Sequence, residues 1–259
     1  MASKEQFLDV IRSALTQSRV ARTDLPLPDH LEPTIPPELI QEQAASIREQ
    51  SLSNNESDLT KLTSTALLQG WNVVTIPSKS QLPQAIVELA KASNCTSVVK
   101  TSHNIIDNSE IDNALISNGI AIAELTHETD AKQKSSNQNL VTLAANSDLG
   151  ITGVDYFIAS TATAAIMATT GKSRLVSLLP PIHAAVVEFH QVISTFDDLL
   201  ILLQAELPQK NPGKWHMNLI SGPSRTGDIE NTIVTGVHGP REVHLLLVLE
   251  EGNAKGTSI

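Results

Sequence analysis

The strand-helix-strand pattern that decides the fold begins with the stretch Trp71-Asn72-Val73-Val74-Thr75-Ile76. Its β-branched residues favour a strand. Apolar side chains then recur from Leu82 to Ala90 with the period of an amphipathic helix, and a second short apolar run follows at 97–100. A strand, a helix and another strand in this order indicate an α/β unit.

The pattern continues on both sides of this unit. Helices are expected near 38–50, 58–69 and 110–117, a strand near 120–123, and a polar loop over 126–139 that is mobile at 133–138. The second half contains one strong helix at 196–207 and several strand-like runs, at 154–159, 164–168, 175–179, 184–189, 217–220 and 243–249. Alternating units followed by clustered strands predict a mixed, mostly parallel sheet flanked by helices.

The N-terminal part predicts a helical extension. Ser3 and Gln6 form a capping-box pattern, and a helix is expected over residues 4–17. Prolines then recur between Pro26 and Pro37, which favours an extended tether. We therefore divide the chain into residues 1–57, with this helix, the tether and a second helix, and an α/β domain over residues 58–259. The first helix presents an apolar stripe for packing on itself, in a homo-oligomer or on a partner: Phe7, Leu8, Ile11 and Leu15.

Composition limits the classes of function. The chain has 259 residues, 41% of them hydrophobic, which is enough for one large core. A net charge of -10 disfavours broad attraction to nucleic acid or to an anionic membrane. The N-terminus lacks a signal-peptide pattern and the aliphatic runs are too short for membrane insertion, so a soluble cytoplasmic protein is expected. One cysteine, Cys95, cannot supply the thiolates of an iron-sulfur cluster.

Two polar loops near the C-terminus predict a binding site. The first is Ser221-Gly222-Pro223-Ser224-Arg225-Thr226-Gly227-Asp228-Ile229-Glu230, and the second is His238-Gly239-Pro240-Arg241. Glycine and proline bend the main chain, while Ser, Thr and Arg supply donors for a polar or anionic group. The alternative is an ordinary turn followed by a helix cap. The second loop favours binding, because a simple connection does not need histidine, glycine, proline and arginine in succession.

Two further regions contribute candidate ligand-binding residues. The stretch from Gly150 to Tyr156 opens a long strand-like run, and the hydroxyls of Thr161 and Thr163 follow it. Polar residues after a strand often line a ligand crevice, although Thr is also a good strand former. Pro180 and Pro181 are expected to end a strand and to hold His183 at its edge. A lone histidine of this kind is more often structural than catalytic.

The common catalytic motifs do not match. The run Thr170-Gly171-Lys172-Ser173 lacks the first glycine of a phosphate loop, because position 166 is Ile166, and a hairpin turn is the preferred interpretation. The surroundings of Ser224 miss the nucleophile-elbow pattern. A relay of Asp228, His238 and Ser224, or a metal site that also uses His183 and Glu230, has no diagnostic spacing. The sequence therefore assigns no catalytic residue and no metal ligand.

Taken together, these segments resemble the lactate-utilisation protein C family, whose domain is called LUD. The resemblance covers about residues 71–249 and rests on five motifs in the family's order: Gly150-Ile151-Thr152, Thr161-Ala162-Thr163, Leu179-Pro180-x-x-His183, the 221–230 loop and Gly236-Val237-His238-Gly239-Pro240. At Ser160 and Ala162 this chain differs from the family pattern, where Asp and Gly are usual.

The resemblance implies a fold of the class shared by ribose-phosphate isomerases, CoA transferases and formyltetrahydrofolate cyclo-ligases. It also implies a role in bacterial oxidation of L-lactate to pyruvate beside two iron-sulfur partner proteins. The lone Cys95 fits a companion with no cluster or other cofactor of its own.

Our leading hypothesis is an accessory subunit with a pocket for a polar or anionic ligand, and the sequence leaves open whether the chain is itself an enzyme. The alternatives are an independent isomerase, transferase or ligase acting on a phosphorylated or acyl-CoA substrate, and a sensor or assembly scaffold. Arg225 is the expected oxygen clamp, because its fork binds two oxygens at once. The full set of expected ligand-binding residues is Thr161, Thr163, His183, Ser221, Gly222, Ser224, Arg225, Thr226, Asp228, Glu230, His238, Gly239 and Arg241.

Overall fold

The structure is a computed structural model that describes residues 35–107, 109–125, 134–168, 173–206, 216–227 and 233–249. A compact unit extends from Ile40 to Ile259, and of the unit before it only residues 35–39 are described. The expected helix at 4–17 and most of the proline-rich tether lie outside the described residues. The boundary expected at residues 57 and 58 stays a prediction.

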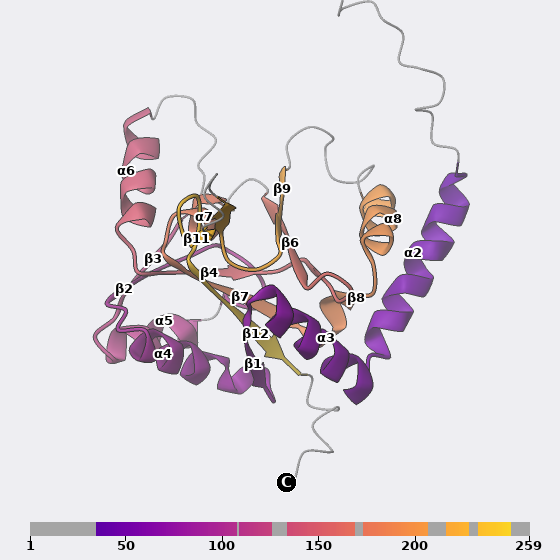
Figure 1. Cartoon of the computed structure of the whole chain (residues 1–259), viewed down its shortest axis with the longest axis horizontal. Helices are drawn as coiled ribbons and strands as arrows, with labels where there is room; N and C mark the ends of the chain where they lie inside the picture. Colours follow the sequence, from indigo (N-terminus) through magenta and orange to yellow (C-terminus); the bar gives the residue numbers. More distant parts are fainter. Residues whose placement is uncertain are drawn as a thin grey trace, which may run out of the picture. The chain divides into compact units, whose positions relative to one another are not determined.

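A six-stranded parallel sheet forms the centre of the fold, in the order β1-β12-β7-β4-β2-β3 (Figure 1). The two long central strands, β7 and β12, are almost entirely buried because both faces of the sheet are covered. This arrangement confirms the predicted α/β class with a mostly parallel sheet. The strands are β1 (Asn72–Ile76), β2 (Ser97–Lys100), β3 (Ala121–Glu124), β4 (Leu149–Gly153), β7 (Ile182–Glu188) and β12 (Glu242–Val248).

A second sheet packs on one face of the first. It contains β5 (Tyr156–Ile158), β6 (Thr163–Ala168), β8 (Val192–Ile193) and β9 (His216–Ile220), in the order β8-β5-β6-β9. Strand β6 is antiparallel to both neighbours, whereas β5 and β8 are parallel. Phe157 and Ala164 share an apolar cluster with Leu245 and Leu247 of the central sheet. The two sheets therefore enclose a common core.

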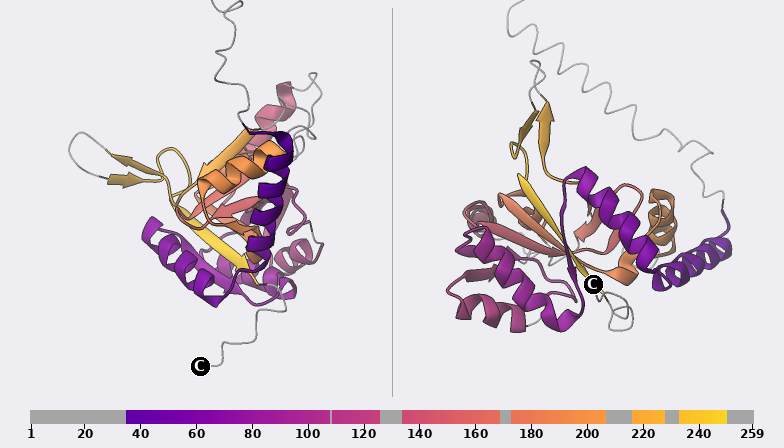
Figure 2. Two further views of the ribbon diagram at one scale, coloured as in Figure 1. Left: turned by 90° about the vertical axis from the view of Figure 1, so that its right-hand side faces the viewer. Right: turned by 60° about the horizontal axis from the view of Figure 1, so that its bottom comes forward.

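Helices cover the remaining faces (Figure 2). Helices α4 (Leu82–Ala92) and α5 (Ser109–Ser117) pack on the face of the six-stranded sheet opposite to the second sheet. The outer side of the second sheet packs against α2 (Pro37–Leu52) and α8 (Phe196–Glu206). Helix α3 (Glu56–Gln69) begins at a capping box of Asn55 and Asp58 and ends at Gly70, whose φ of 92° suits glycine. A separate hairpin joins β10 (Arg225–Gly227) and β11 (Ile233–Thr235).

Three local predictions were wrong. The run at 175–179, expected to be a strand, forms the short helix α7 (Leu175–Leu178), because a short apolar run does not distinguish a strand from a buried helix. The expected loop at 126–139 includes the start of α6 (Lys134–Ala145), while residues 126–133 lie outside the described part. The long strand expected after Gly150 is two strands, β4 and β5, which belong to different sheets.

Candidate functional site

The chain crosses from one sheet to the other at Val154 and Asp155, and this crossing creates a polar cleft. The amide of Val154 donates to Val186 O in the central sheet, whereas the amide of Asp155 donates to Ala165 O in the second sheet. Asp155 therefore follows the carboxyl end of β4. The same side chain is held in place by Met167 N, which donates to Asp155 Oδ2 at 2.7 Å.

The cleft lies where the strand order reverses. After β2 the chain continues to β3 on one side, and after β4 it continues to β7 on the other side. The loops that leave two such neighbouring strands diverge, and this crevice is where open α/β sheets commonly bind ligands. The cleft has a volume of about 250 Å³. It is lined by residues that follow β2 and β4, that end or follow β7, or that belong to β5, β6 and α8: His103, Asn104, Asp155, Tyr156, Met167, Glu188, His190, Gln191 and Glu206.

His103 and Gly153 are in direct contact at the inner side of the cleft. A Cβ atom at Gly153 would lie 2.1 Å from His103 Cγ, so a side chain at position 153 would displace the ring. His103 Nε2 lies 3.9 Å from Asp155 Oδ1, and the exposed fractions of the two side chains are only 10% and 22%. The absence of a side chain at Gly153 thus allows the imidazole to lie near the carboxylate.

The other carboxylates of the cleft are also fixed by hydrogen bonds. Tyr156 Oη donates to Glu206 Oε1, and burial together with this glutamate raises the pKa of the phenol, which stays protonated. Glu188 accepts a hydrogen bond from the amide of Gln191, while Gln191 Oε1 accepts from the amide of Glu188 at 2.8 Å. Gln191 Nε2 in turn donates to Val154 O at 2.8 Å. These bonds hold the side chains around the cleft in defined positions.

The predicted ligand-binding residues lie mainly at the opposite edge of the central sheet from the cleft, where the strands begin. In the first group, Thr163 Oγ1 lies 2.8 Å from Thr161 Oγ1 and 2.6 Å from Ser221 Oγ, so three hydroxyls form one chain. The turn between the two threonines places Ala162 at a φ of 48°. Trp71 Nε1 donates to Ala162 O at 2.8 Å, which fixes that turn on the core.

A second group joins the two polar loops. The amide of Ser224 donates to Pro240 O, and Gly236 N donates to Ser224 O, both at 2.9 Å. A Cβ at Gly239 would lie 3.3 Å from that of Ser224, so the two loops approach closely. Thr226 pairs with Val234 in the hairpin of β10 and β11.

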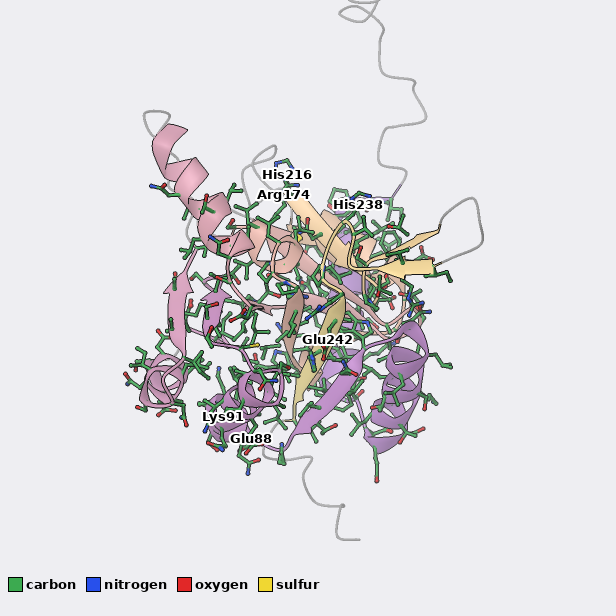
Figure 3. All side chains as sticks on the ribbon, turned by 60° about the vertical axis from the view of Figure 1, so that its left-hand side comes forward. Glu88, Lys91, Arg174, His216, His238 and Glu242 are labelled. Atoms are coloured by element: carbon green, nitrogen blue, oxygen red, sulfur yellow. The ribbon has the colours of Figure 1, made fainter. Side chains whose placement is uncertain are left out.

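Further contacts place the rest of the first loop. Gly222, with a φ of 98°, lies against Gln69 O at the end of α3, and Arg225 Nη2 donates to the same carbonyl oxygen at 3.0 Å. Arg241 N donates to Pro181 O. Asp228 and Glu230 lie outside the described residues. His238 is exposed on the opposite side of the molecule from Glu88 and Lys91 of α4 (Figure 3).

His183 does not lie at a strand edge, which corrects the prediction. It is the second residue of β7, pairs with Gly150 and Val243 on both sides, and is fully buried. Its Nε2 lies 2.8 Å from Thr152 Oγ1, and its Nδ1 has no hydrogen-bond partner in the described part of the chain. Burial, with a smaller contribution from His244, lowers the pKa of His183 to about 3, so the ring is neutral at pH 7.

Sequence reasoning missed the cleft because it treated residues 150–160 as one strand. The signal that could have found it is the polar residue after each buried run: His103 after β2, Asp155 after β4 and His190 after β7. Within the described residues, no group of three His, Cys, Asp or Glu side chains is arranged to hold a metal ion. None of the helices in that part of the chain is long and apolar enough to cross a membrane.

Comparison with known proteins agrees with this fold and with the predicted family resemblance. Residues 59–248 match the LUD domain, which is most of the chain. The chain belongs to the LUD domain family. A crystal structure of a DUF162 family protein from Deinococcus radiodurans has the same fold, with a TM-score of 0.50, 18% identity, and coverage of 74% of this chain and 96% of that one.

Among curated relatives, the chain is similar to two proteins named lactate utilization protein C. The one from Halalkalibacterium halodurans is 36% identical over 105 residues, and the one from an Exiguobacterium species is 36% identical over 136 residues. The alignments cover 40% and 49% of this chain, and 45% and 56% of the two relatives. This LUD domain chain thus spans about half the length of the curated relatives it matches.

Proposed function

We propose that this chain is an accessory protein of bacterial L-lactate utilisation that works beside iron-sulfur proteins. The observation that carries the proposal is its membership of the LUD domain family, together with the similarity to proteins named lactate utilization protein C. Oxidation of lactate to pyruvate releases two electrons, and iron-sulfur clusters are suitable acceptors that need several Cys ligands. A chain with one cysteine is better suited to assist such proteins than to carry their clusters.

The environment of Cys95 supports this division of work. The residue is buried, and burial is the largest cause that raises the pKa of its thiol to about 11. A buried, protonated thiol is a poor metal ligand and a poor nucleophile. In the proposed system, electron transfer therefore takes place on the partner proteins.

The two polar loops are the proposed site for an anionic ligand of this system, such as a carboxylate. Arg225 is exposed, and its guanidinium carries five N–H donors, of which Nη2 bonds Gln69 O and sets the position of the group. The hydroxyl of Ser224 would add a further donor. Ligand binding here would place an acid beside the hairpin of β10 and β11.

Growth of a deletion strain on L-lactate as sole carbon source tests the proposal. Loss of growth after deletion, restored by the wild-type gene but not by Arg225→Ala, is the expected result. Lys91→Ala is the matched control, since it also removes one exposed positive charge but lies on α4, away from the loops. Its growth should equal that of the wild type.

Biochemical readouts complete this test. Thermal unfolding of purified Arg225→Ala establishes whether loss of the bond to Gln69 O unfolds the chain. Co-purification of the tagged chain with proteins that show iron-sulfur absorbance is expected from lactate-grown cells. Normal growth of the deletion strain on lactate would contradict the proposal. Turnover of a phosphorylated or acyl-CoA substrate by the purified chain alone would favour the independent enzyme.

A further inference from the structure

The cleft at the carboxyl edge of the central sheet is a second site, separate from the polar loops. Strand β7 runs from Ile182, beside Pro181 and the Arg241 amide, to Glu188, which lines the cleft. Seven residues at about 3.3 Å each place the two regions on the order of 20 Å apart. A ligand of the cleft is therefore distinct from a ligand held by Arg225.

Charge decides which class of ligand the cleft accepts. Three of its nine lining residues are carboxylic acids, Asp155, Glu188 and Glu206, and no lysine or arginine is among these described residues. Arg48 of α2 is not one of the lining residues, although its Nη2 lies 3.5 Å from Glu206 Oε1. Because like charges repel one another strongly in a partly enclosed site, an anion such as lactate is disfavoured here. A ligand with positive charge and hydrogen-bond donors is favoured.

The volume of the cleft and its uncharged lining residues narrow the class of ligand further. A volume of about 250 Å³ is slightly below the roughly 300–1,000 Å³ of typical drug-sized sites, so the ligand is small. Tyr156 and Met167 supply an aromatic ring and a polarisable thioether for the alkyl part of the ligand, and aromatic faces attract cations. The carboxylates are already oriented by bonds to Met167 N, Gln191 N and Tyr156 Oη, which lowers the entropy cost of binding.

We propose that the cleft between the loops after β2 and β4 binds a small organic cation with N–H donors, of the primary amine or diamine class. Asp155 and Glu188 pair with the ammonium groups, and Tyr156 and Met167 contact the carbon chain. His103, which lies on Gly153 beside Asp155, forms the inner wall. This site goes beyond the proposed role in lactate utilisation and does not depend on it.

Titration of the purified full chain with 1,4-diaminobutane, monitored by calorimetry and by NMR amide shifts, tests the proposal. The uncharged isostere 1,4-butanediol is the control ligand. We expect saturable diamine binding with shifts centred on residues 103, 155 and 188, and binding of the diol at least about tenfold weaker, because ionic pairing supplies most of the affinity. L-Lactate should produce no shifts at these three residues.

Two variants locate the site and one controls for charge. Glu188→Gln and Asp155→Asn keep an oxygen acceptor for Gln191 N and Met167 N, so the folded structure is retained, and each should weaken diamine binding about tenfold. Glu88→Gln removes the same charge from the exposed surface of α4, outside the cleft, and should bind as the wild type does. Thermal unfolding confirms that each variant is folded.

Three results would overturn the proposal. The first is no diamine binding by the wild type up to about 10 mM, a concentration that reveals even weak sites. The second is equal binding of diamine and diol. The third is folded Glu188→Gln and Asp155→Asn variants that bind like Glu88→Gln. These measurements use the purified chain, so their failure leaves the lactate growth test unaffected, and failure of the growth test leaves the cleft unaffected.

Discussion

Substitution of Gly153 by alanine should destabilise the protein by forcing His103 away from the inner wall of the cleft. The new Cβ would lie 2.1 Å from His103 Cγ, 2.2 Å from Nδ1 and 2.7 Å from Cβ, whereas ordinary contacts are 3.4–4 Å. A shift of more than 1 Å is therefore needed at a side chain that is 10% exposed. Overpacking of this kind costs about 1–3 kcal/mol, and we expect about 2 kcal/mol for Gly153→Ala.

Urea unfolding followed by circular dichroism measures this cost, and a double-mutant cycle assigns its cause. In a His103→Ala background the ring atoms are absent, so Gly153→Ala should cost about 1–2 kcal/mol less than in the wild type. Gly227→Ala is the matched control, because nothing lies within 4 Å of its Cβ, and its effect should be within about 0.5 kcal/mol. Additive effects of Gly153→Ala and His103→Ala would refute the reasoning, as would a cost equal to that of the control.

The remaining predictions concern the turn, the sheet and the cysteine. Ala162→Gly should leave stability unchanged or raise it by up to about 1 kcal/mol, and Ala162→Val should lower it by about 2 kcal/mol, because a φ of 48° disfavours β-branched side chains; urea unfolding measures both. His183 is protonated more readily in the unfolded state, so the free energy of unfolding should fall by up to about 1.4 kcal/mol per pH unit from pH 6.5 toward 4. This pH dependence should be weaker in His183→Gln. An unchanged dependence in the variant would mean that another group causes it. Hydrogen bonds, first that from the Thr96 amide, lower the pKa of Asp148, so the ionised carboxylate stabilises the fold above about pH 4 and this contribution is lost on further acidification. Acid-unfolding curves of Asp148→Asn should lack this contribution. Cys95 should react with an aromatic disulfide reagent at pH 8 far more slowly in native protein than in urea, and equal rates would contradict its burial.

The buried parallel strands were predictable from the sequence because their patterns leave little choice. Apolar residues run without a break from 184 to 187 in β7 and from 245 to 249 in and just after β12, and a glutamate follows each run. Such runs are typical of strands covered on both faces. Helices α3 and α4 were also predictable, since apolar side chains recur at helical spacing along both and Gly70 caps the end of α3.

The cleft was not predictable because its position depends on pairing between distant segments. Residues 150–160 have a uniform strand-like composition, and the break at Val154 and Asp155 exists only because Val186 and Ala165 offer acceptors in different sheets. The same applies to His183, whose burial depends on β4 and β12 on its two sides. The short helix α7 depends on Gly150, where a Cβ would lie 1.9 Å from Val176 O.

The turn at Ala162 shows how this chain holds an alanine in the left-handed backbone region, at a φ of 48°. A left-handed residue costs alanine about 1–2 kcal/mol relative to its preferred regions, whereas glycine adopts it freely. The conformation persists because Ala162 O accepts the Trp71 indole hydrogen and Trp71 packs edge-on against Phe157, with ring centroids 6.0 Å apart. Both rings are buried, so a change of the turn would leave the indole N–H without its partner inside the core.

The hydroxyl chain depends on the same turn. Thr161 and Thr163 flank Ala162, and the distance of 2.8 Å between their hydroxyl oxygens, with Ser221 2.6 Å from Thr163, requires the turn to stay closed. The methyl group of Ala162 is fully buried in the core cluster with Trp71 and Phe157. Alanine at position 162 therefore costs stability, while the three hydroxyls of the predicted polar-ligand region stay together.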